Sequence, residues 1–325
     1  MQAVWLENNH LDLREVPSPS RQGEVLVRVR LTGICGTDLE LVRGYYPYTG
    51  IPGHEFVGEV VGFSLAASPP GDGSAPIAVG TRVVGEINAA CGECEQCLHG
   101  RSMHCEKRSV LGIIARDGVF AEYVNLPLKN LHPVPDSVPD EMAVFCEPLA
   151  AALEIQQQVH IQPGQSILLV GAGRLGQLVA QTLVLTGANL RVLARHAIQK
   201  KLLTDRGIAL VDEDAILPRH YDVVVEATGS TDGFEIARKA VRPRGNLVLK
   251  STYKGDISLN MSAIVVDEIN LTGSRCGPFE PALRLMEQKL VDPTVLVAEQ
   301  YSLSQALQAF DSAARAGMLK VLIKP

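Results

Sequence analysis

The chain has 325 residues, of which 46% are hydrophobic and 20% are charged, and its formal net charge is -6. This length suits two globular domains, because a single hydrophobic core stops growing at about 250–300 residues. The weak, evenly spread charge argues against nucleic acid or an anionic membrane as a partner, and no apolar run approaches the ~18 residues of a membrane helix.

The part from residue 1 to about 147 is predicted to be mostly β. It begins with MQAVWLENNHLDLREV, which lacks the basic and apolar regions of a secretory signal, so we expect a cytoplasmic protein. Short Val-rich segments punctuated by Gly and Pro follow, namely GEVLVRVRLTGI, FVGEVVGF, GTRVVGEI and VFAEYVNL. The stretch SLAASPPGDGSAPIAVG (64–80) is predicted to be a surface loop.

Two sparse motifs in this part carry possible metal ligands. Cys35 stands in GICGTDLE, and His54 and Glu55 stand in PGHEFVGEVVG. Taken alone, such residues are more often a buried thiol or a hydrogen-bonded loop side chain than metal ligands. Their spacing therefore does not identify a site without further evidence.

A dense cysteine motif gives a much stronger signal. Cys91, Cys94, Cys97 and Cys105 follow the pattern C-x2-C-x2-C-x7-C in a chain with an odd number of cysteines, which argues against a disulfide framework. Four thiolates fill a tetrahedral zinc shell and leave no open position. An iron–sulfur cluster fits less well, because the last two cysteines of its motif are usually closer together in the sequence and are followed by Pro. We predict a structural zinc site whose loss would unfold the loop locally.

The pattern of predicted elements changes after Pro148. The helical segment LAAALEIQQQV comes first, and SILLVGAGRLG, QLVAQTLVLTG, RVLA, AIQKKLLTDRG, DVVVEATG (222–229) and GNLVLKST (245–252) follow in strand–helix alternation. This alternation predicts βαβ units and a parallel sheet. The tail is predicted to form a helix over 302–317 and a final strand, MLKVLI.

A glycine fingerprint follows the first of these strands directly and precedes a helix. It runs from Gly171 through Gly173, Arg174 and Leu175 to Gly176. The glycines allow a tight turn and a close approach of the backbone to a pyrophosphate, which the N-terminus of the helix then binds. We therefore predict dinucleotide binding here.

The end of the next strand indicates which dinucleotide is preferred. An acidic residue that binds the ribose 2′-hydroxyl is expected there, but the chain has Ala194, followed by Arg195 and His196. The missing carboxylate removes repulsion of a 2′-phosphate, and Arg195 would bind that phosphate. The alternative is a solvated charge at a strand end. We predict that NADP is preferred over NAD.

In this order, the motifs GICGTDLE, PGHEFVGEVV, the four-cysteine loop, EPLA, VGAGRLG and VVVEATG cover nearly the whole chain. The chain thereby resembles the zinc-dependent medium-chain alcohol dehydrogenases of the sorbitol and threonine dehydrogenase type. The resemblance implies an α/β protein with a GroES-like β-rich catalytic domain, 1–149 and 277–325, and a Rossmann domain with a doubly wound parallel sheet, 150–276. It also implies a homo-oligomer, a dimer or a tetramer.

The resemblance further implies a catalytic zinc ion surrounded by Cys35, His54 and Glu147, with Glu55 beside it. Alcohol dehydrogenases proper have a cysteine as the third ligand. Glu147 takes that place here, as in polyol-type members, and Cys146 is adjacent. Whether Glu147 binds zinc directly, binds through water or yields to Glu55 stays open.

Other roles are implied by position in the same motifs. Thr37 matches the hydroxyl that takes the proton of the alcohol, although a loop hydroxyl can also simply cap the backbone. Asp38 matches an acid behind the ligand histidine, and Thr228 in VVVEATG is expected at the cofactor. Glu40 departs from the family, which often has a histidine at this end of the proton relay. Carboxyl groups ordinarily titrate near pH 4, so a carboxylate is a poorer relay near neutrality.

The expected function is hydride transfer between NADP(H), or NAD(H), and a secondary alcohol or polyol or the corresponding carbonyl, with two zinc ions per chain. A threonine-dehydrogenase-like oxidation of an amino alcohol is the alternative within the family. A zinc-free reductase resembling quinone reductase and a non-catalytic nucleotide-binding redox module are the others. Tyr45, Tyr46, Tyr48 and Arg275 are possible substrate contacts, but packing or an ion pair explains them equally well.

Overall fold

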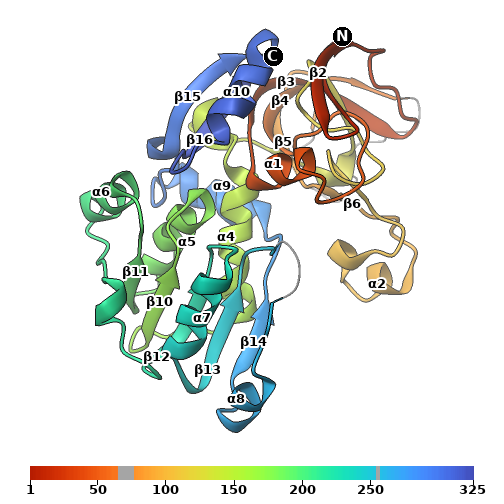
Figure 1. Cartoon of the computed structure of the whole chain (residues 1–325). Helices are drawn as coiled ribbons and strands as arrows, with labels where there is room; N and C mark the ends of the chain where they lie inside the picture. Colours follow the sequence, from red (N-terminus) through yellow and green to blue (C-terminus); the bar gives the residue numbers. More distant parts are fainter. Residues whose placement is uncertain (65–76, 254–256) are drawn as a thin grey trace. The chain divides into compact units, whose positions relative to one another are not determined.

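The computed structural model describes residues 1–64, 77–253 and 257–325 (Figure 1). They form two compact units, one of Met1–Glu147 with Phe279–Pro325 and one of Pro148–Pro278. The surface loop predicted over 64–80 falls mostly on 65–76, outside the described residues. Within the described part of the chain, no helix has the length and apolar character needed to cross a membrane.

The first unit is mostly β, as the sequence predicts. Its strands are β1 Gln2–Glu7, β2 His10–Glu15, β3 Glu24–Gly33, β4 Glu55–Phe63, β5 Arg82–Gly85, β6 Asn88–Ala89, β7 Ser109–Val110, β8 Tyr123–Pro127, β9 Leu131–Pro133, β15 Val297–Ser302 and β16 Lys320–Lys324. Its helices are α1 Gly36–Val42, α2 Glu95–Leu98, α3 Asp140–Ala143, α9 Phe279–Glu287 and α10 Ala306–Ala313.

A seven-stranded sheet organises this unit. Its order is β15-β16-β3-β4-β5-β9, and β8 also pairs with β3. The last strand, β16, runs antiparallel to β3 and pairs Leu322 with Gly33. The C-terminal segment therefore completes a sheet that the N-terminal half begins.

The core of this unit explains why the tail returns to it. Phe120 and Phe310, which are far apart in the sequence, pack edge to face with their ring centroids 5.3 Å apart. Val4, Ile34 and Val321 are fully buried in the same cluster. At about 25 cal/mol per Å² of buried apolar surface, this shared core holds the two segments together.

The second unit is built on a five-stranded parallel sheet in the order β11-β10-β12-β13-β14. The chain enters it through α4 Cys146–Gln158 and continues through β10 Ser166–Val170, α5 Arg174–Val184, β11 Asn189–Leu193, α6 Ala197–Asp205, β12 Tyr221–Glu226, α7 Thr231–Ala240, β13 Val241–Leu249, α8 Met261–Val266 and β14 Asn270–Gly273. The strands that follow β10 in the chain lie on its two opposite sides, so the strand order reverses at β10. The predicted α/β fold class is confirmed.

Two predicted elements have different bounds in the structure. The helix expected over 302–317 is a 3-10 turn, Leu303–Gln305, followed by α10, and Gly317 at φ +77 lies in the turn beyond it. The strand expected over 222–229 ends at Glu226, because Ala227 begins a tight turn in which Gly229 has φ +67. This early end places the last three residues of the motif at the carboxyl edge of the sheet.

Candidate metal centres and dinucleotide site

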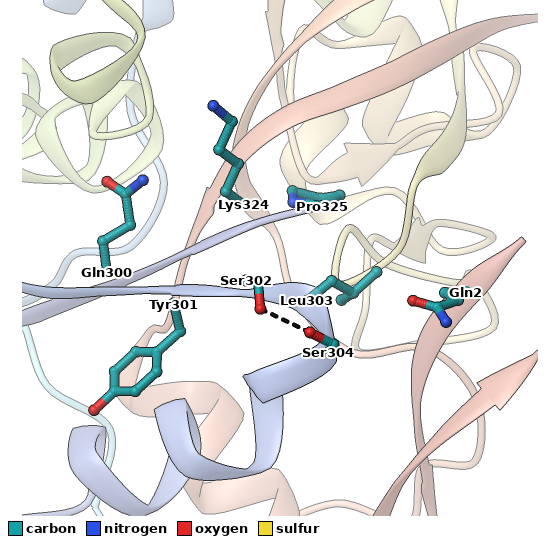
Figure 2. A pocket seen from close by; sticks show the side chains of 8 residues that line it. All are labelled: Gln2, Gln300, Tyr301, Ser302, Leu303, Ser304, Lys324 and Pro325. Atoms are coloured by element: carbon teal, nitrogen blue, oxygen red, sulfur yellow. Dashed lines mark hydrogen bonds between the residues drawn. The ribbon is translucent and has the colours of Figure 1, made fainter.

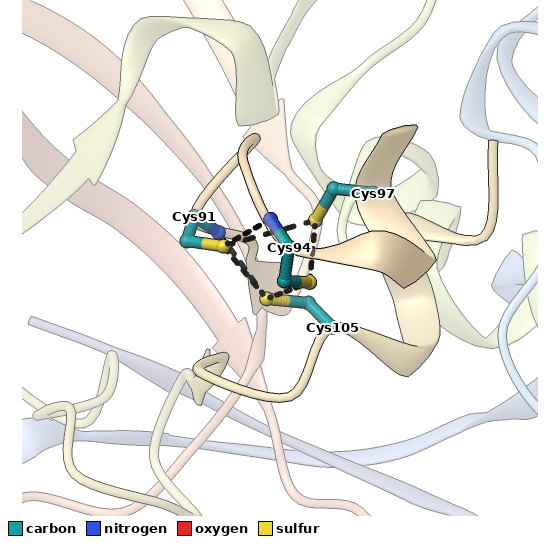
Figure 3. Close-up of side chains that lie close together, drawn as sticks. All are labelled: Cys91, Cys94, Cys97 and Cys105. Carbon is teal, nitrogen blue, oxygen red and sulfur yellow. Dashed lines mark hydrogen bonds between the residues drawn. The ribbon is translucent and has the colours of Figure 1, made fainter. Parts of the chain in front are cut away.

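The four clustered cysteines converge on one point, as Figure 3 shows. Their Sγ atoms are 3.5 Å apart for Cys94–Cys97 and Cys91–Cys105, 3.8 Å for Cys94–Cys105 and 4.0 Å for Cys91–Cys97. Four ligands at a Zn–S distance of about 2.3 Å in a tetrahedron are separated by about 3.8 Å. The thiol arrangement therefore fits a closed zinc shell.

Backbone donors surround these sulfur atoms. The N–H groups of Glu93 and Cys94 lie 3.5 Å and 3.4 Å from the sulfur of Cys91 and lower its pKa. The N–H groups of Cys97 and Glu106 lower the pKa of Cys94 to about 6, whereas burial raises the pKa of Cys97 to about 12. Four thiolates repel one another, so a divalent cation is needed to hold all of them ionised.

A second, sparser group lies at the end of β3 and the start of β4. Among the described residues, the possible ligand atoms of Cys35, His54 and Glu55 lie within 4.8 Å of one another. The antiparallel pairing of β3 with β4 sets Gly33 opposite Glu55, which brings the two sequence motifs together. One sulfur, one imidazole and one carboxylate are ligands that zinc accepts, and three protein ligands leave a fourth position open.

Asp38 lies behind the histidine of this group. It is fully buried, and its Oδ2 accepts a hydrogen bond from the N–H of Cys35 at 2.8 Å. Its Oδ1 faces His54 Nδ1 at 3.3 Å, without an aligned hydrogen bond. Burial acts to lower the pKa of His54, but Asp38 and Cys35 outweigh it and raise this pKa well above its usual range. Because Nδ1 faces the carboxylate, Nε2 is the nitrogen left for a metal ion.

A buried cation that was not predicted from the sequence also belongs to this group. Lys320 of β16 is 3% exposed, and its Nζ contacts Oε2 of Glu55, which is 1% exposed. The same ammonium donates to the carbonyl oxygen of Ile34 at 3.3 Å and lies 5.7 Å from the ring centroid of Phe145. A lysine inside the apolar strand MLKVLI was the available signal.

The remaining residues predicted for the catalytic site are Thr37 and Glu40 of the proton relay, which are close to this group in the sequence, and the metal ligand Glu147, which is on a separate helix. Thr37 is half-buried, and its Oγ1 lies 3.8 Å from the sulfur of Cys35. Glu40 on α1 forms an ion pair with Arg43 at 2.6 Å. Glu147 lies in the first turn of α4, outside the described group of Cys35, His54 and Glu55. The roles of Thr37, Glu40 and Glu147 stay predictions.

The glycine fingerprint forms the turn between β10 and α5. Gly171 has φ +102, and a Cβ there would lie 2.7 Å from Thr228 Cγ2. A Cβ on Gly176 would lie 2.2 Å from the carbonyl oxygen of Gly171. At Gly173, the N-cap of α5, no atom of the described residues lies within 4 Å of that position. The turn is thus closely packed on one side and open at the helix N-terminus, which fits a phosphate group.

The remaining predicted cofactor residues flank this turn. Arg174 and Leu175 begin α5, and both are half-buried. At the end of β11, Ala194 is 4% exposed, Arg195 is exposed, and His196 is the N-cap of α6. The side chain at position 194 therefore offers no carboxylate, and the cation beside it reaches solvent.

Two surface hollows differ in their relation to the predicted site. A hollow of about 500 Å³ is lined by eight residues, and none of them is a predicted site residue (Figure 2): Gln2, Gln300, Tyr301, Ser302, Leu303, Ser304, Lys324 and Pro325. A second, of about 330 Å³, is partly lined by Tyr46 and Tyr48. The hydroxyl of Tyr48 donates to the carbonyl oxygens of Ile51 at 2.7 Å and Arg116 at 3.0 Å, so it holds the loop before His54.

Comparisons with known proteins agree with this geometry. The sequence profile described as "Alcohol dehydrogenase GroES-like domain" matches residues 21–136. The chain is 31% identical to sorbitol dehydrogenase of Halalkalibacterium halodurans, over 97% of this chain and 96% of that one. It is 33% identical to L-threonine 3-dehydrogenase of Pyrococcus abyssi, over 78% and 75%. A putative zinc-binding dehydrogenase from Sinorhizobium meliloti, solved bound to NADP, superposes with a TM-score of 0.90 at 30% identity, over 100% of this chain and 99% of that one.

Proposed function

Because the chain belongs to the zinc-dependent medium-chain alcohol dehydrogenase family, we propose that it oxidises a polyol or another secondary alcohol, or reduces the corresponding carbonyl, with NADP as the preferred dinucleotide. It is an oxidoreductase that acts on CH–OH groups. The observation that carries the proposal is the group of Cys35, His54 and Glu55, with Asp38 buried behind the histidine. This group is a donor set with an open position, as a catalytic zinc site requires.

The residues of the first unit have distinct tasks in this reaction. Zinc bound by Cys35 and His54 would supply a Lewis acid that polarises the substrate oxygen and lowers the pKa of the alcohol. Thr37, whose Oγ1 lies 3.8 Å from the sulfur of Cys35, would take the proton of the alcohol. Asp38 would orient the ring of His54, whose Nδ1 its Oδ1 faces at 3.3 Å, and Lys320 forms an ion pair with Glu55. Glu147 is the alternative to Glu55 as the third ligand.

The second unit would hold the dinucleotide, whose nicotinamide accepts or donates the hydride. The open N-terminus of α5 at Gly173 suits the pyrophosphate. Ala194 and Arg195 favour a 2′-phosphate over a free 2′-hydroxyl, because a carboxylate at 194 is replaced by a neutral side chain next to a cation. NADP preference is therefore part of the proposal.

The share of each relative's sequence that the chain matches favours a polyol over an amino alcohol as the substrate. The chain matches nearly the whole of the sorbitol dehydrogenase, whereas it matches 75% of the threonine dehydrogenase. Oxidation of an L-threonine-like amino alcohol is the second candidate. An assembly of two or four copies remains a prediction, which the mass of the purified protein in solution tests.

The test is a substrate screen on the zinc-loaded protein. Sugar alcohols, vicinal diols, simple secondary alcohols and L-threonine are each offered with NADP and with NAD, and reduced nicotinamide is followed by its absorbance. We expect turnover of a polyol or secondary alcohol, with the higher kcat/KM for NADP. Turnover confined to L-threonine would favour the second candidate, and no turnover of any alcohol or carbonyl by protein with both zinc sites filled would refute the proposal.

A further inference from the structure

The most deeply buried carboxylate of the second unit's described residues belongs to Glu226, the last residue of β12, which is 0% exposed. Its Oε1 accepts hydrogen bonds from the N–H of Thr228 at 2.5 Å, the hydroxyl of Thr228 at 2.5 Å and the N–H of Gly229 at 3.1 Å. Its Oε2 accepts one from the hydroxyl of Tyr253. Removing a carboxylate from water is costly, and these donors offset that cost.

The contacts of Glu226 join two turns at the carboxyl edge of the sheet. Thr228 and Gly229 belong to the turn after β12, and Tyr253 follows β13. The backbone carbonyl of Glu226 also accepts a hydrogen bond from the N–H of Lys250 at 2.9 Å. A Cβ on Gly229 would lie 3.1 Å from the carbonyl oxygen of Thr252, so the two turns are in close contact.

The turn after β12 in turn supports the glycine fingerprint. The N–H of Ala227 donates to the carbonyl of Val170 at 2.9 Å. The methyl group of Thr228 occupies the space that a Cβ on Gly171 would need. Because both Thr228 donors are held by Glu226, the position of this methyl group depends on the carboxylate.

The location of these turns connects the carboxylate of Glu226 with the dinucleotide site. Strand order reverses at β10, and dinucleotides bind in the crevice at the carboxyl ends of the strands beside such a reversal. An apolar side chain at position 226 would be buried at a lower desolvation cost than the carboxylate of Glu226. On the basis of the proposed function, we propose that Glu226 is a positioning residue of the dinucleotide site. Its carboxylate fixes the turns after β10 and β12, together with residues 250–253 after β13, in the shape that receives the dinucleotide.

The affinity for the dinucleotide and the choice between NADP and NAD should depend on different residues. Glu226 contacts the turns after β12 and β13, whereas the 2′-position is sensed at Ala194 and Arg195, after β11. Loss of the carboxylate should therefore weaken NADPH and NADH by the same factor. A change at Arg195 should alter their ratio.

The experiment compares Glu226→Gln and Tyr253→Phe with the matched control Asp222→Asn. Asp222 is a carboxylate of the same strand at its other end, held by the N–H and hydroxyl of Ser166 at 2.7 Å and 2.9 Å and by Arg242 at 2.8 Å. The dissociation constants of NADPH and NADH are measured by nicotinamide fluorescence, and the thermal midpoint of each variant is measured alongside.

We expect Glu226→Gln to raise both dissociation constants by about tenfold or more, because the remaining amide oxygen is uncharged and the amide nitrogen cannot accept the hydrogen bond that the second carboxylate oxygen accepts. Tyr253→Phe, which removes one donor at a half-buried position, should raise both by about threefold to tenfold and carries the test if Glu226→Gln does not fold. Asp222→Asn should lower the thermal midpoint and leave both constants within about twofold. The dinucleotide KM of the positioning variants should rise while kcat changes little.

Two results would overturn the inference while the proposed function stands. One is unchanged NADPH and NADH binding in both positioning variants. The other is a loss of affinity in Asp222→Asn equal to that in Glu226→Gln, which would show that affinity only follows stability. A wild-type protein that binds neither dinucleotide would overturn the proposed function and this inference with it.

Discussion

Lys320 and Glu55 form a buried ion pair that joins the last strand of the chain to the start of β4. Their side chains are 3% and 1% exposed, and 264 residues of sequence lie between them. Glu55 also belongs to the group that contains Cys35 and His54. The C-terminal strand therefore supplies the charge that balances an acidic side chain at the candidate catalytic metal.

In protein stripped of zinc, replacing Lys320 with methionine should leave the carboxylate of Glu55 buried without its cation. We expect the free energy of unfolding to fall by about 3–5 kcal/mol, measured by chemical denaturation. The double variant Lys320→Met with Glu55→Gln should recover much of this loss, because the remaining pair is neutral. Lys324→Met, at an exposed position of the same strand, is the control and should cost about 0.5 kcal/mol or less. Equal losses at 320 and 324 would contradict the prediction.

Two zinc ions per chain are predicted, and each should depend on its own cysteines. Cys94→Ser should remove one equivalent of zinc and lower the thermal midpoint, because the metal would join all four cysteines of the loop from Cys91 to Cys105. Cys35→Ser should remove the other equivalent and abolish turnover with a smaller effect on stability. Metal analysis of the purified proteins measures both losses. The control, Cys276→Ala, lies outside both groups and should keep two equivalents; one equivalent in the wild type would rule out the two-site prediction.

Local motifs explain why much of the site was predictable from the sequence. The spacing of Cys91, Cys94, Cys97 and Cys105 fixes their ligand geometry within one short loop, and the structure brings their sulfur atoms together. Gly171 and Gly176 are required by backbone geometry and close packing that the fingerprint itself encodes. Patterns of this kind act through neighbours in the chain, so one sequence suffices to find them.

Long-range partners were not predictable for the opposite reason. Nothing near Glu55 in the sequence indicates that its cation is Lys320, and nothing near Glu226 indicates Tyr253. Arg116 and Glu24 form a further buried pair, at 2.7 Å, across 92 residues. Charged residues within apolar strands mark such pairs, but the choice of partner depends on strand order and register, which the local pattern leaves undetermined.

Arg195 is predicted to set the dinucleotide preference. Arg195→Ala should lower kcat/KM for NADP by about tenfold to a hundredfold, because a charge-assisted contact to the 2′-phosphate is lost, and should leave NAD nearly unchanged. Ala194→Asp should shift the preference toward NAD by repelling the phosphate and binding the 2′-hydroxyl. Arg191→Ala, at an exposed position of β11, the strand that precedes Arg195, is the control. Equal kcat/KM losses for the two dinucleotides in Arg195→Ala would contradict this role.

Asp222 should make the stability of the second unit depend on pH. Burial acts to raise the pKa of Asp222, but the N–H of Ser166 and the guanidinium of Arg242 outweigh it and lower this pKa. The folded pKa is thus below the unfolded value, so the carboxylate stabilises the fold above about pH 4 and this contribution is lost as the pH falls through the folded pKa.

Asp222→Asn should therefore lower the free energy of unfolding by about 1 kcal/mol at neutral pH. This is less than the loss expected for a fully buried charged contact. The difference from the wild type should begin to shrink below about pH 5. Denaturation curves at several pH values from 7.5 to 3.5 measure this difference. Asp214→Asn, an exposed carboxylate of the same unit, is the control and should show no such trend. A penalty that stays constant over the whole range would show that ionised Asp222 does not stabilise the fold.

Glu40 is predicted to stand at the surface end of the proton relay, where the family often has a histidine. Its carboxylate forms an ion pair with Arg43 at 2.6 Å on α1. We expect Glu40→Gln to lower kcat by about tenfold or less and to change the shape of the pH–rate profile, a smaller effect than the 10²–10⁴ of a direct proton donor. Glu40→His should raise kcat near neutral pH above that of Glu40→Gln, because an imidazole ordinarily titrates near pH 6.5. Arg43→Gln keeps the carboxylate and is the control for loss of the ion pair alone. If Glu40→Gln kept both kcat and its pH dependence, the carboxylate would serve only its ion pair with Arg43, and protons would leave Thr37 by another route.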